Sequence, residues 1–214
     1  MIINHIYHSC YTISTKKHQL IFDYFQGELK LEEEKIKIFF VSHGHDDHYS
    51  PKIHPLADAV VLWEGMPYRD DKTYALAPEE ELELEGIRIR TSGSTDEGLS
   101  FEIEVEGKRI VHVGDLNNWV WPEDTKEERN QMNDDFLYSL MKFKKEPDAL
   151  LFPIDYRLKE NYTIGVDQAV DYLKPKLLFP LHFREYPEIL PVYKEHIKDK
   201  VRMILPNEMP FEIK

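Results

Sequence analysis

The feature that most constrains this chain is a histidine-rich motif that directly follows an apolar run. Residues 36–41 are mostly apolar and predict a buried strand. The loop leaving it contains His43-x-His45-x-Asp47-His48, three imidazoles and a carboxylate. These groups suit Zn²⁺, and a short loop can direct them at two adjacent ions. A polar turn that happens to contain histidines is the alternative, but this density of ligand types favours a metal site.

The remaining pattern begins with hairpins and continues with alternating strands and helices. Helices are predicted from about Ser50 and over residues 124–145, 166–173 and 188–200. Strands are predicted over residues 2–7, 11–14, 19–24, 36–41, 57–63, 81–90 with a break at Glu85-Gly86, 101–105, 109–113, 149–154, 176–181, 201–205 and 209–213. This order fits an α+β fold, a four-layer αβ/βα sandwich. Because no repeat or linker interrupts it, residues 1–214 are expected to form one domain.

The histidine motif resembles the signature loop of the metallo-β-lactamase-fold hydrolases. Val113-Gly114-Asp115 and Pro180-Leu181-His182 are similar to the family's later Gly-Asp and final His motifs. The opening His8-Ser9-Cys10-Tyr11 most resembles the small branch that includes the ascorbate-phosphate lactonases. The resemblance spans the chain from the first predicted hairpin to the final His motif. It implies the same four-layer sandwich and a metal-dependent hydrolase.

By this resemblance, six residues would bind two metal ions. They are His43 and His45 for the first ion, Asp47 and His48 for the second, Asp115 as a bridge between both, and His182 completing the second site. Two zinc ions bridged by a carboxylate can lower the pKa of water from about 15.7 to near 7, which yields hydroxide at neutral pH. Asp47 can hold this nucleophile and then pass its proton to the leaving group. The flavodiiron relatives replace the second His of the loop with Glu, so His45 favours hydrolysis over redox chemistry.

One position departs from the family pattern. The family normally supplies a third His to the first metal from the loop before the strand of residues 101–105, but residues 91–98 contain none. His112 lies inside a predicted strand and is favoured as a core or supporting residue over a ligand. Asp96 can replace the missing His as an oxygen ligand, Ser94 can hold a water, or the first site is empty in a mononuclear enzyme. A position of Asp96 near the metals is preferred, while the water on Ser94 and the mononuclear enzyme both stay open.

Other residues are candidates for the surroundings of the site. By resemblance, Asp23 buttresses the metal loop, and a plain turn carboxylate is its alternative. His8 is a candidate for contact with substrate or with the metal site, or else an ordinary hairpin histidine. Trp119 can form a wall over the ligand or pack against the following helix. Arg157 can clamp a carboxylate or phosphate, or pair with Asp155.

Composition narrows the class of substrate. The 214 residues include 40 acidic and 27 basic side chains, and the net charge of −13 repels phosphate backbones. A single cysteine excludes an internal disulfide and fits a reducing compartment. Neither a signal peptide nor a long apolar span is visible. We therefore expect a cytoplasmic protein with a small-molecule substrate and with neither nucleic acid nor membrane as a partner.

These observations together predict a zinc-dependent hydrolase acting on a small ester, lactone or phosphoester. Two zinc ions are expected, or one if the first site is incomplete, and iron or manganese can take the place of zinc. A metal-dependent phosphodiesterase or nuclease is one alternative. A metal-binding relative that does not turn over its ligand is another, because the third His is missing.

Overall fold

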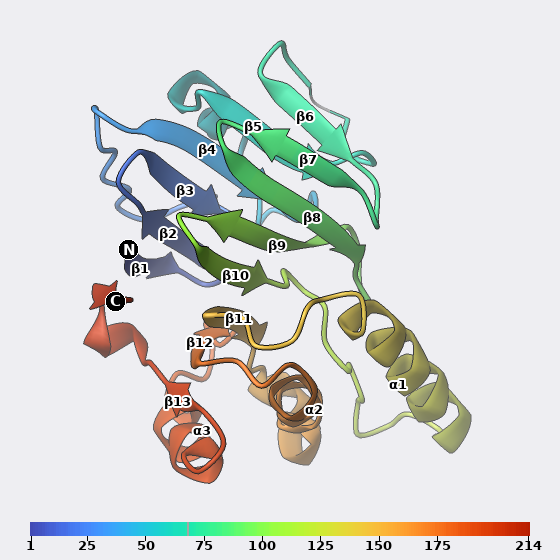
Figure 1. Cartoon of the computed structure of the whole chain (residues 1–214). Helices are drawn as coiled ribbons and strands as arrows, with labels where there is room; N and C mark the ends of the chain where they lie inside the picture. The colour runs from blue at the N-terminus through green and yellow to red at the C-terminus, as the bar shows by residue number, and fades with distance from the viewer. Residues whose placement is uncertain (68) are drawn as a thin grey trace.

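Two seven-stranded sheets pack against each other in the computed structural model, which describes residues 1–67 and 69–214 (Figure 1). The first sheet has the strand order β14-β1-β2-β3-β4-β5-β6. Its strands are β1 (Ile2–Tyr7), β2 (Cys10–Ser14), β3 (His18–Phe22), β4 (Ile36–Val41), β5 (Ala59–Trp63), β6 (Thr73–Leu76) and β14 (Phe211–Glu212). From β3 to β6 the neighbouring strands are parallel, whereas β1, β2 and β14 join antiparallel.

The second sheet has the order β13-β12-β11-β10-β9-β8-β7. Its strands are β7 (Glu81–Leu84), β8 (Ile87–Gly93), β9 (Leu99–Val105), β10 (Lys108–His112), β11 (Ala149–Pro153), β12 (Leu177–Leu181) and β13 (Arg202–Met203). The antiparallel hairpins β7–β8 and β9–β10 lead into the parallel strands β10 to β13. The parallel part brings the carboxyl ends of β10, β11 and β12 to one edge.

Helices cover the outer face of the second sheet (Figure 1). They are α1 (Lys126–Leu140), α2 (Ile164–Leu173) and α3 (Ile189–Ile197), with the 3₁₀ helices η2 (Tyr156–Asn161) and η3 (Pro206–Glu208) in the connections. A reciprocal capping box between Thr125 and Glu128 begins α1. The helix ends earlier than the sequence pattern predicts, because the backbone N–H of Lys144 instead donates to the buried Glu102 carboxylate.

The outer face of the first sheet has a smaller apolar core of its own. The 3₁₀ helix η1 (Pro51–Leu56) and the segment after β3 cover it, contributing Ile53, Leu29 and Leu31 to the packing. The predicted α+β four-layer fold is confirmed, with this lighter layer on one side. Two predictions differ in detail: β6 was not predicted, and the two C-terminal strands are only two residues long. No helix in the described ranges is both long and apolar enough to span a bilayer.

Candidate metal centre

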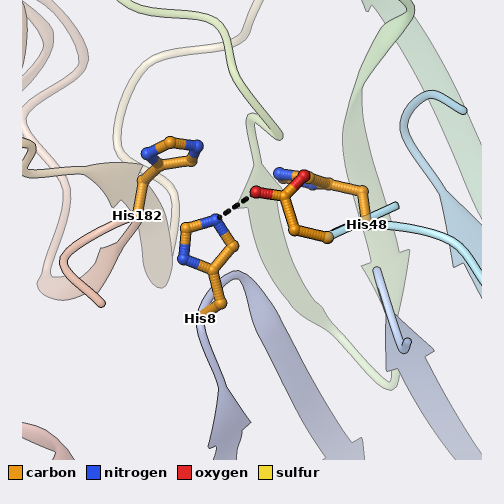
Figure 2. Close-up of side chains that lie close together, drawn as sticks. His8, His48 and His182 are labelled. Atoms are coloured by element: carbon orange, nitrogen blue, oxygen red, sulfur yellow. Dashed lines mark ion pairs between the residues drawn. The ribbon is translucent and has the colours of Figure 1, made fainter. Parts of the chain in front are cut away.

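The structure brings the six predicted ligands together at one end of the two sheets. The loop after β4 contributes His43, His45, Asp47 and His48, while Asp115 and His182 follow β10 and β12. Together with His8 and Asp96, their donor atoms form two groups, and the atoms of each group lie within 4.8 Å of one another. The first group is His43, His45, Asp96 and Asp115, and the second is His8, Asp47, His48 and His182. Figure 2 shows three imidazoles of the second group facing one another.

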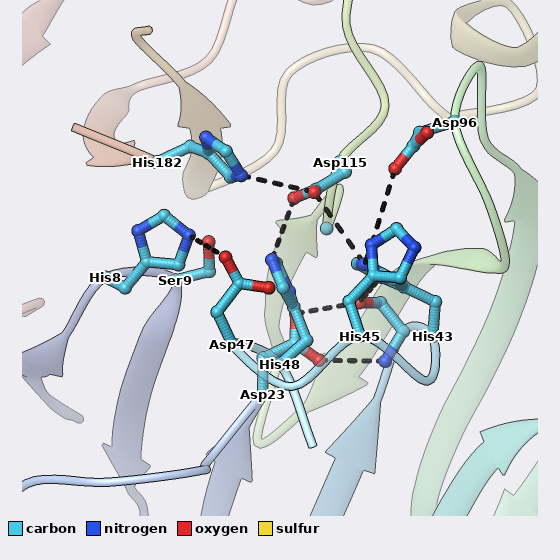
Figure 3. Close-up of polar contacts among 12 residues, drawn as sticks. His8, Ser9, Asp23, His43, His45, Asp47, His48, Asp96, Asp115 and His182 are labelled. Atoms are coloured by element: carbon cyan, nitrogen blue, oxygen red, sulfur yellow. Dashed lines mark hydrogen bonds and ion pairs between the residues drawn. The ribbon is translucent and has the colours of Figure 1, made fainter. Parts of the chain in front are cut away.

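Asp115 lies between the two groups (Figure 3). Its Oδ1 is 3.2 Å from Nε2 of His48, and its Oδ2 is 3.2 Å from Nε2 of His182 and 3.7 Å from Nε2 of His43. The approach depends on Gly114, which has a φ of +56°, and a Cβ there would lie 2.7 Å from the Cβ of Ser42. The carboxylate thus faces both groups, the placement that a bridging ligand requires.

Three of the histidines are held so that Nε2 faces the centre. Nδ1 of His48 donates to the buried carboxylate of Asp23 at 3.0 Å. Nδ1 of His43 lies 2.9 Å from Oγ of Ser42, which donates to the same carboxylate at 2.8 Å. Nδ1 of His182 is 2.8 Å from Oδ2 of Asp155. Fixing one ring nitrogen selects the tautomer that leaves the other free for a metal.

Asp23 and Asp155 therefore support the candidate ligand histidines His48 and His182. Asp23 contacts the metal loop, as the resemblance implied, and also accepts the backbone N–H of Ser42 at 2.8 Å. Asp155, which the sequence suggested only as a partner of Arg157, contacts both Arg157 and His182. Its position at the end of β11, between the strands that lead to Asp115 and His182, was the available signal. Burial opposes ionisation, but His182 and Arg157 lower the pKa of Asp155 to about 2.

The first group contains Asp96, the residue preferred as a substitute for the missing histidine. Asp96 Oδ2 lies 3.8 Å from Nδ1 of His45, which in turn is 2.9 Å from Nε2 of His43. Ser94 lies within the same turn, where its Oγ accepts the backbone N–H of Asp96 at 3.2 Å. His112 is in neither group: its Nε2 donates to the carbonyl of Ser9, and its ring stacks on Phe22.

The residues present fit a pair of divalent cations. His48 Nε2, Asp115 Oδ1 and both ring nitrogens of His8 are buried and make no hydrogen bond among the described residues, although His48 Nε2 lies near Asp115 Oδ1 and His8 Nε2 near Asp47 Oδ2. Buried polar atoms rarely lack partners, so these atoms point to a group that would satisfy them. Ligand atoms placed tetrahedrally around zinc at about 2.0–2.1 Å lie about 3.3 Å apart. The separations of 3.2 to 3.8 Å between His and Asp donors agree with that value.

Opposite charges set the proton affinity of the centre. Burial disfavours the imidazolium form, but Asp115 and Asp155 raise the pKa of His182 to about 9. Burial lowers the pKa of His48 as well, but Asp115 and Asp23 outweigh this effect and hold the pKa well above its ordinary value. Burial and the neighbouring His48 lower the pKa of His43 to about 4. Without a metal, the carboxylates therefore favour the protonated forms of His48 and His182, whereas His43 stays neutral.

We expect zinc affinity to rise with pH up to about 9, the shifted pKa value of His182. Below pH 9 the metal-free His182 carries a proton, and zinc must displace it to bind the neutral imidazole. For each proton that zinc displaces, the logarithm of the zinc-binding constant increases by one more per pH unit. Calorimetry at pH 7 in buffers of different ionisation enthalpy would detect at least about one proton released per chain. A pH-independent affinity without proton release would contradict the expectation.

An open cleft of about 360 Å³ lies over the centre. It is lined by His45, Asp47, Thr95, Asp96, Asp115, Trp119, Trp121, Met132, Arg157 and His182. Trp119 donates its indole N–H to the backbone carbonyl of Asp115 at 2.9 Å, and its ring is nearly parallel to that of Trp121. The Arg157 guanidinium lies 6.0 Å from the ring centre of Trp121. Trp119 and Arg157 both line the cleft, and Arg157 also pairs with Asp155; contact of either residue with a substrate stays a prediction.

Comparison with known proteins places this fold and centre in a family. The chain is 27% identical over 203 residues to a UPF0173 metal-dependent hydrolase of Thermoplasma acidophilum, covering 84% of this chain and 81% of the relative. A UPF0173 protein of Pyrococcus abyssi is 25% identical over 190 residues, with the same two coverages.

Solved structures share the fold at low sequence identity. A novel metallo hydrolase from Ignicoccus hospitalis matches with a TM-score of 0.64 and 19% identity, covering 100% of this chain and 99% of that one. CmlA, a diiron β-hydroxylase from Streptomyces venezuelae, has a TM-score of 0.63 and 10% identity, over 95% of this chain and 52% of that one. The family model for the beta-lactamase superfamily domain matches residues 3–182. Because that match covers more than half of the chain, the protein belongs to the beta-lactamase superfamily.

Proposed function

We propose that this metal-dependent hydrolase of the metallo-β-lactamase fold uses two zinc ions to hydrolyse a small ester, lactone or phosphoester. The observation that carries the proposal is the meeting of two donor groups at Asp115. Relatives named metal-dependent hydrolases support the reaction class. The fold neighbour with a diiron centre makes iron the principal competitor to zinc, which metal analysis would identify.

When bound, the two ions would supply Lewis acidity, which acidifies a water and polarises the scissile carbonyl or phosphoryl group. The residues of the chain position the reactants. Asp47 lines the cleft, and its Oδ2 lies 3.4 Å from Nε2 of His8 and 3.6 Å from Nη2 of Arg184. The His8 contact lowers the pKa of Asp47 although burial acts in the opposite direction, and the carboxylate is ionised at neutral pH. Asp47 can therefore accept a hydrogen bond from the attacking water and orient it.

The cleft suits a small substrate with one anionic group. Asp155 holds the guanidinium of Arg157 at the rim and raises its pKa, which keeps it charged. Trp119 and Trp121 supply an apolar wall beside it. The net charge of −13 disfavours a polyanion, and we propose no nucleic acid partner. The cytoplasmic location stays a prediction.

We expect Arg157→Gln to raise KM for an anionic substrate by roughly 10- to 100-fold, because a charge-assisted hydrogen bond contributes about 1.5–3 kcal/mol. A neutral ester with the same leaving group is the control, and its kinetics should change much less. The comparison also corrects for any disturbance of His182 through Asp155, since that would affect both substrates. Equal losses on both substrates would contradict an anion-binding role.

The test of the proposed function begins with elemental analysis of protein purified without chelator and again after zinc dialysis. Two zinc ions per chain, together with hydrolysis of a panel of esters, lactones and phosphodiesters, is the expected result. Full metal loading with no turnover across the panel would instead favour a ligand-binding relative. Absence of metal even after dialysis would refute the proposal.

A further inference from the structure

The turn between β1 and β2 has an unusual residue at its first position. His8 and Ser9 form a two-residue connection, with Tyr7 paired to Cys10 across the hairpin. His8 has a φ of 53°, the left-handed region that such turns require and that Gly or Asn normally fills. A larger residue persists there only when its surroundings hold it, and such positions cluster at functional sites. Here the surroundings include His5, whose Nε2 lies 3.2 Å from the His8 carbonyl.

This turn directs the His8 imidazole into the metal centre (Figure 2). The ring is buried, and its centre lies 4.3 Å from that of His182 and 5.5 Å from that of His48. Nε2 is 3.4 Å from Oδ2 of Asp47, yet neither ring nitrogen makes a hydrogen bond within the described residues. By contrast, the ligand histidines His43, His48 and His182 each have Nδ1 held by a partner.

We infer that His8 is an additional ligand of the second metal ion, beside Asp47, His48 and His182. The inference rests on the proposed function, because it assumes that the centre binds metal. The distance of 3.4 Å between His8 Nε2 and Asp47 Oδ2 matches the separation of about 3.3 Å between two ligands of one tetrahedral zinc. A ligand role for Nε2 also accounts for its lack of a hydrogen bond and for the strained backbone conformation of His8.

The two metal sites then differ in chemistry. The first group has two imidazoles and the half-exposed carboxylate of Asp96, whereas the second gains a third imidazole from His8. Imidazole favours zinc over harder cations more than carboxylate does. The second site is therefore the tighter zinc site and fills first. The loop of residues 94–98 supplies no imidazole to the first ion. The β1–β2 turn supplies one, from His8, to the second ion.

The test uses His8→Gly, because glycine adopts the required positive φ without strain and the variant should fold. Zinc affinity of the tighter site would be measured by competition with a chelator, and coordination by the visible spectrum of the cobalt-substituted protein. Loss of a supporting residue typically weakens metal affinity 10- to 100-fold. We expect His8→Gly to weaken the zinc affinity of the tighter site by more than about 100-fold and to alter the visible spectrum of the cobalt-substituted protein.

His196→Gln is the control, since it changes a histidine of α3 that contacts Asp167 and belongs to neither donor group. It should keep the wild-type zinc affinity and cobalt spectrum. If His8→Gly bound zinc and cobalt like the wild type but hydrolysed substrate more slowly, His8 would act through Asp47, and the inference would be overturned while the proposed function stood. If the wild-type chain took up no metal, the proposed function itself would fail.

Discussion

Replacing Asp115 with asparagine should remove most of the bound metal and nearly all of the activity. Asp115 is the carboxylate that approaches both donor groups, within 3.2 Å of His48 and His182 and 3.7 Å of His43. The amide keeps the shape but loses the charge that neutralises two cations. Because loss of a mere supporting residue costs 10- to 100-fold, we expect an activity loss of more than about 100-fold. Elemental analysis should find fewer than two metals per chain.

Asp148→Asn is the matched control for Asp115→Asn. Asp148 is also a buried carboxylate of the second sheet, but it pairs with Lys176 and the backbone of Arg109, away from the centre. Its variant should lose some stability and keep its metal. If Asp115→Asn retained two metals and the wild-type rate, the bridging role would be wrong, and the two groups would have to act independently.

Replacing Gly98 with alanine should destabilise the protein by about 2–5 kcal/mol. Gly98 has a φ of +82°, and a Cβ there would lie 2.0 Å from the carbonyl oxygen of Ser42 and 2.7 Å from the Cβ of His43. That carbonyl accepts the backbone N–H of Leu99 at 2.9 Å, so the loop cannot retreat without breaking a hydrogen bond. Because the same loop presents Asp96, the variant should also bind less metal at the first site.

Gly107→Ala is the control that separates the cost of backbone strain from the cost of the steric clash between a Cβ at residue 98 and Ser42. Gly107 has a similar φ of +75°, but nothing lies within 4 Å of the position that its Cβ would occupy. The left-handed conformation alone costs about 1–2 kcal/mol in a non-glycine residue. Urea denaturation of the two variants should therefore differ by the cost of the contact with Ser42. Equal destabilisation of the two variants would mean that the β8–β9 loop moves to admit the added Cβ at little cost, and would contradict the expected steric clash of residue 98 with Ser42.

The sequence predicted the fold because its strongest signals are local. The apolar run of β4 followed by ligand residues, the hairpins and the Gly-Asp motif each depend on neighbours in the chain. β6 was missed because the half-exposed edge strand Thr73–Leu76 has only one fully buried residue and little alternation. The two-residue strands β13 and β14 were overestimated because they depend on pairing with β12 and β1 rather than on their own pattern.

Details of the site depended on the packing of distant segments. The sequence favoured Asp96 as the residue near the metals but could not predict its position, because the contact of Gly98 with the residues after β4 determines that position. The support of His182 by Asp155 required knowing that β11 lies between β10 and β12. For His8, the sequence showed a histidine near a turn. It could not show the positive φ that directs the ring inward.

The donor groups are divided between the two sheets. His8 and the histidine loop extend from the first sheet, whereas Asp96, Asp115 and His182 extend from the second. Ions bound there would therefore act as crosslinks between the two halves of the chain. Free metal at 100 times its Kd would add about 2.7 kcal/mol to stability. A cell short of metal would accordingly hold this protein in a form whose sheets separate more readily and which proteases reach sooner.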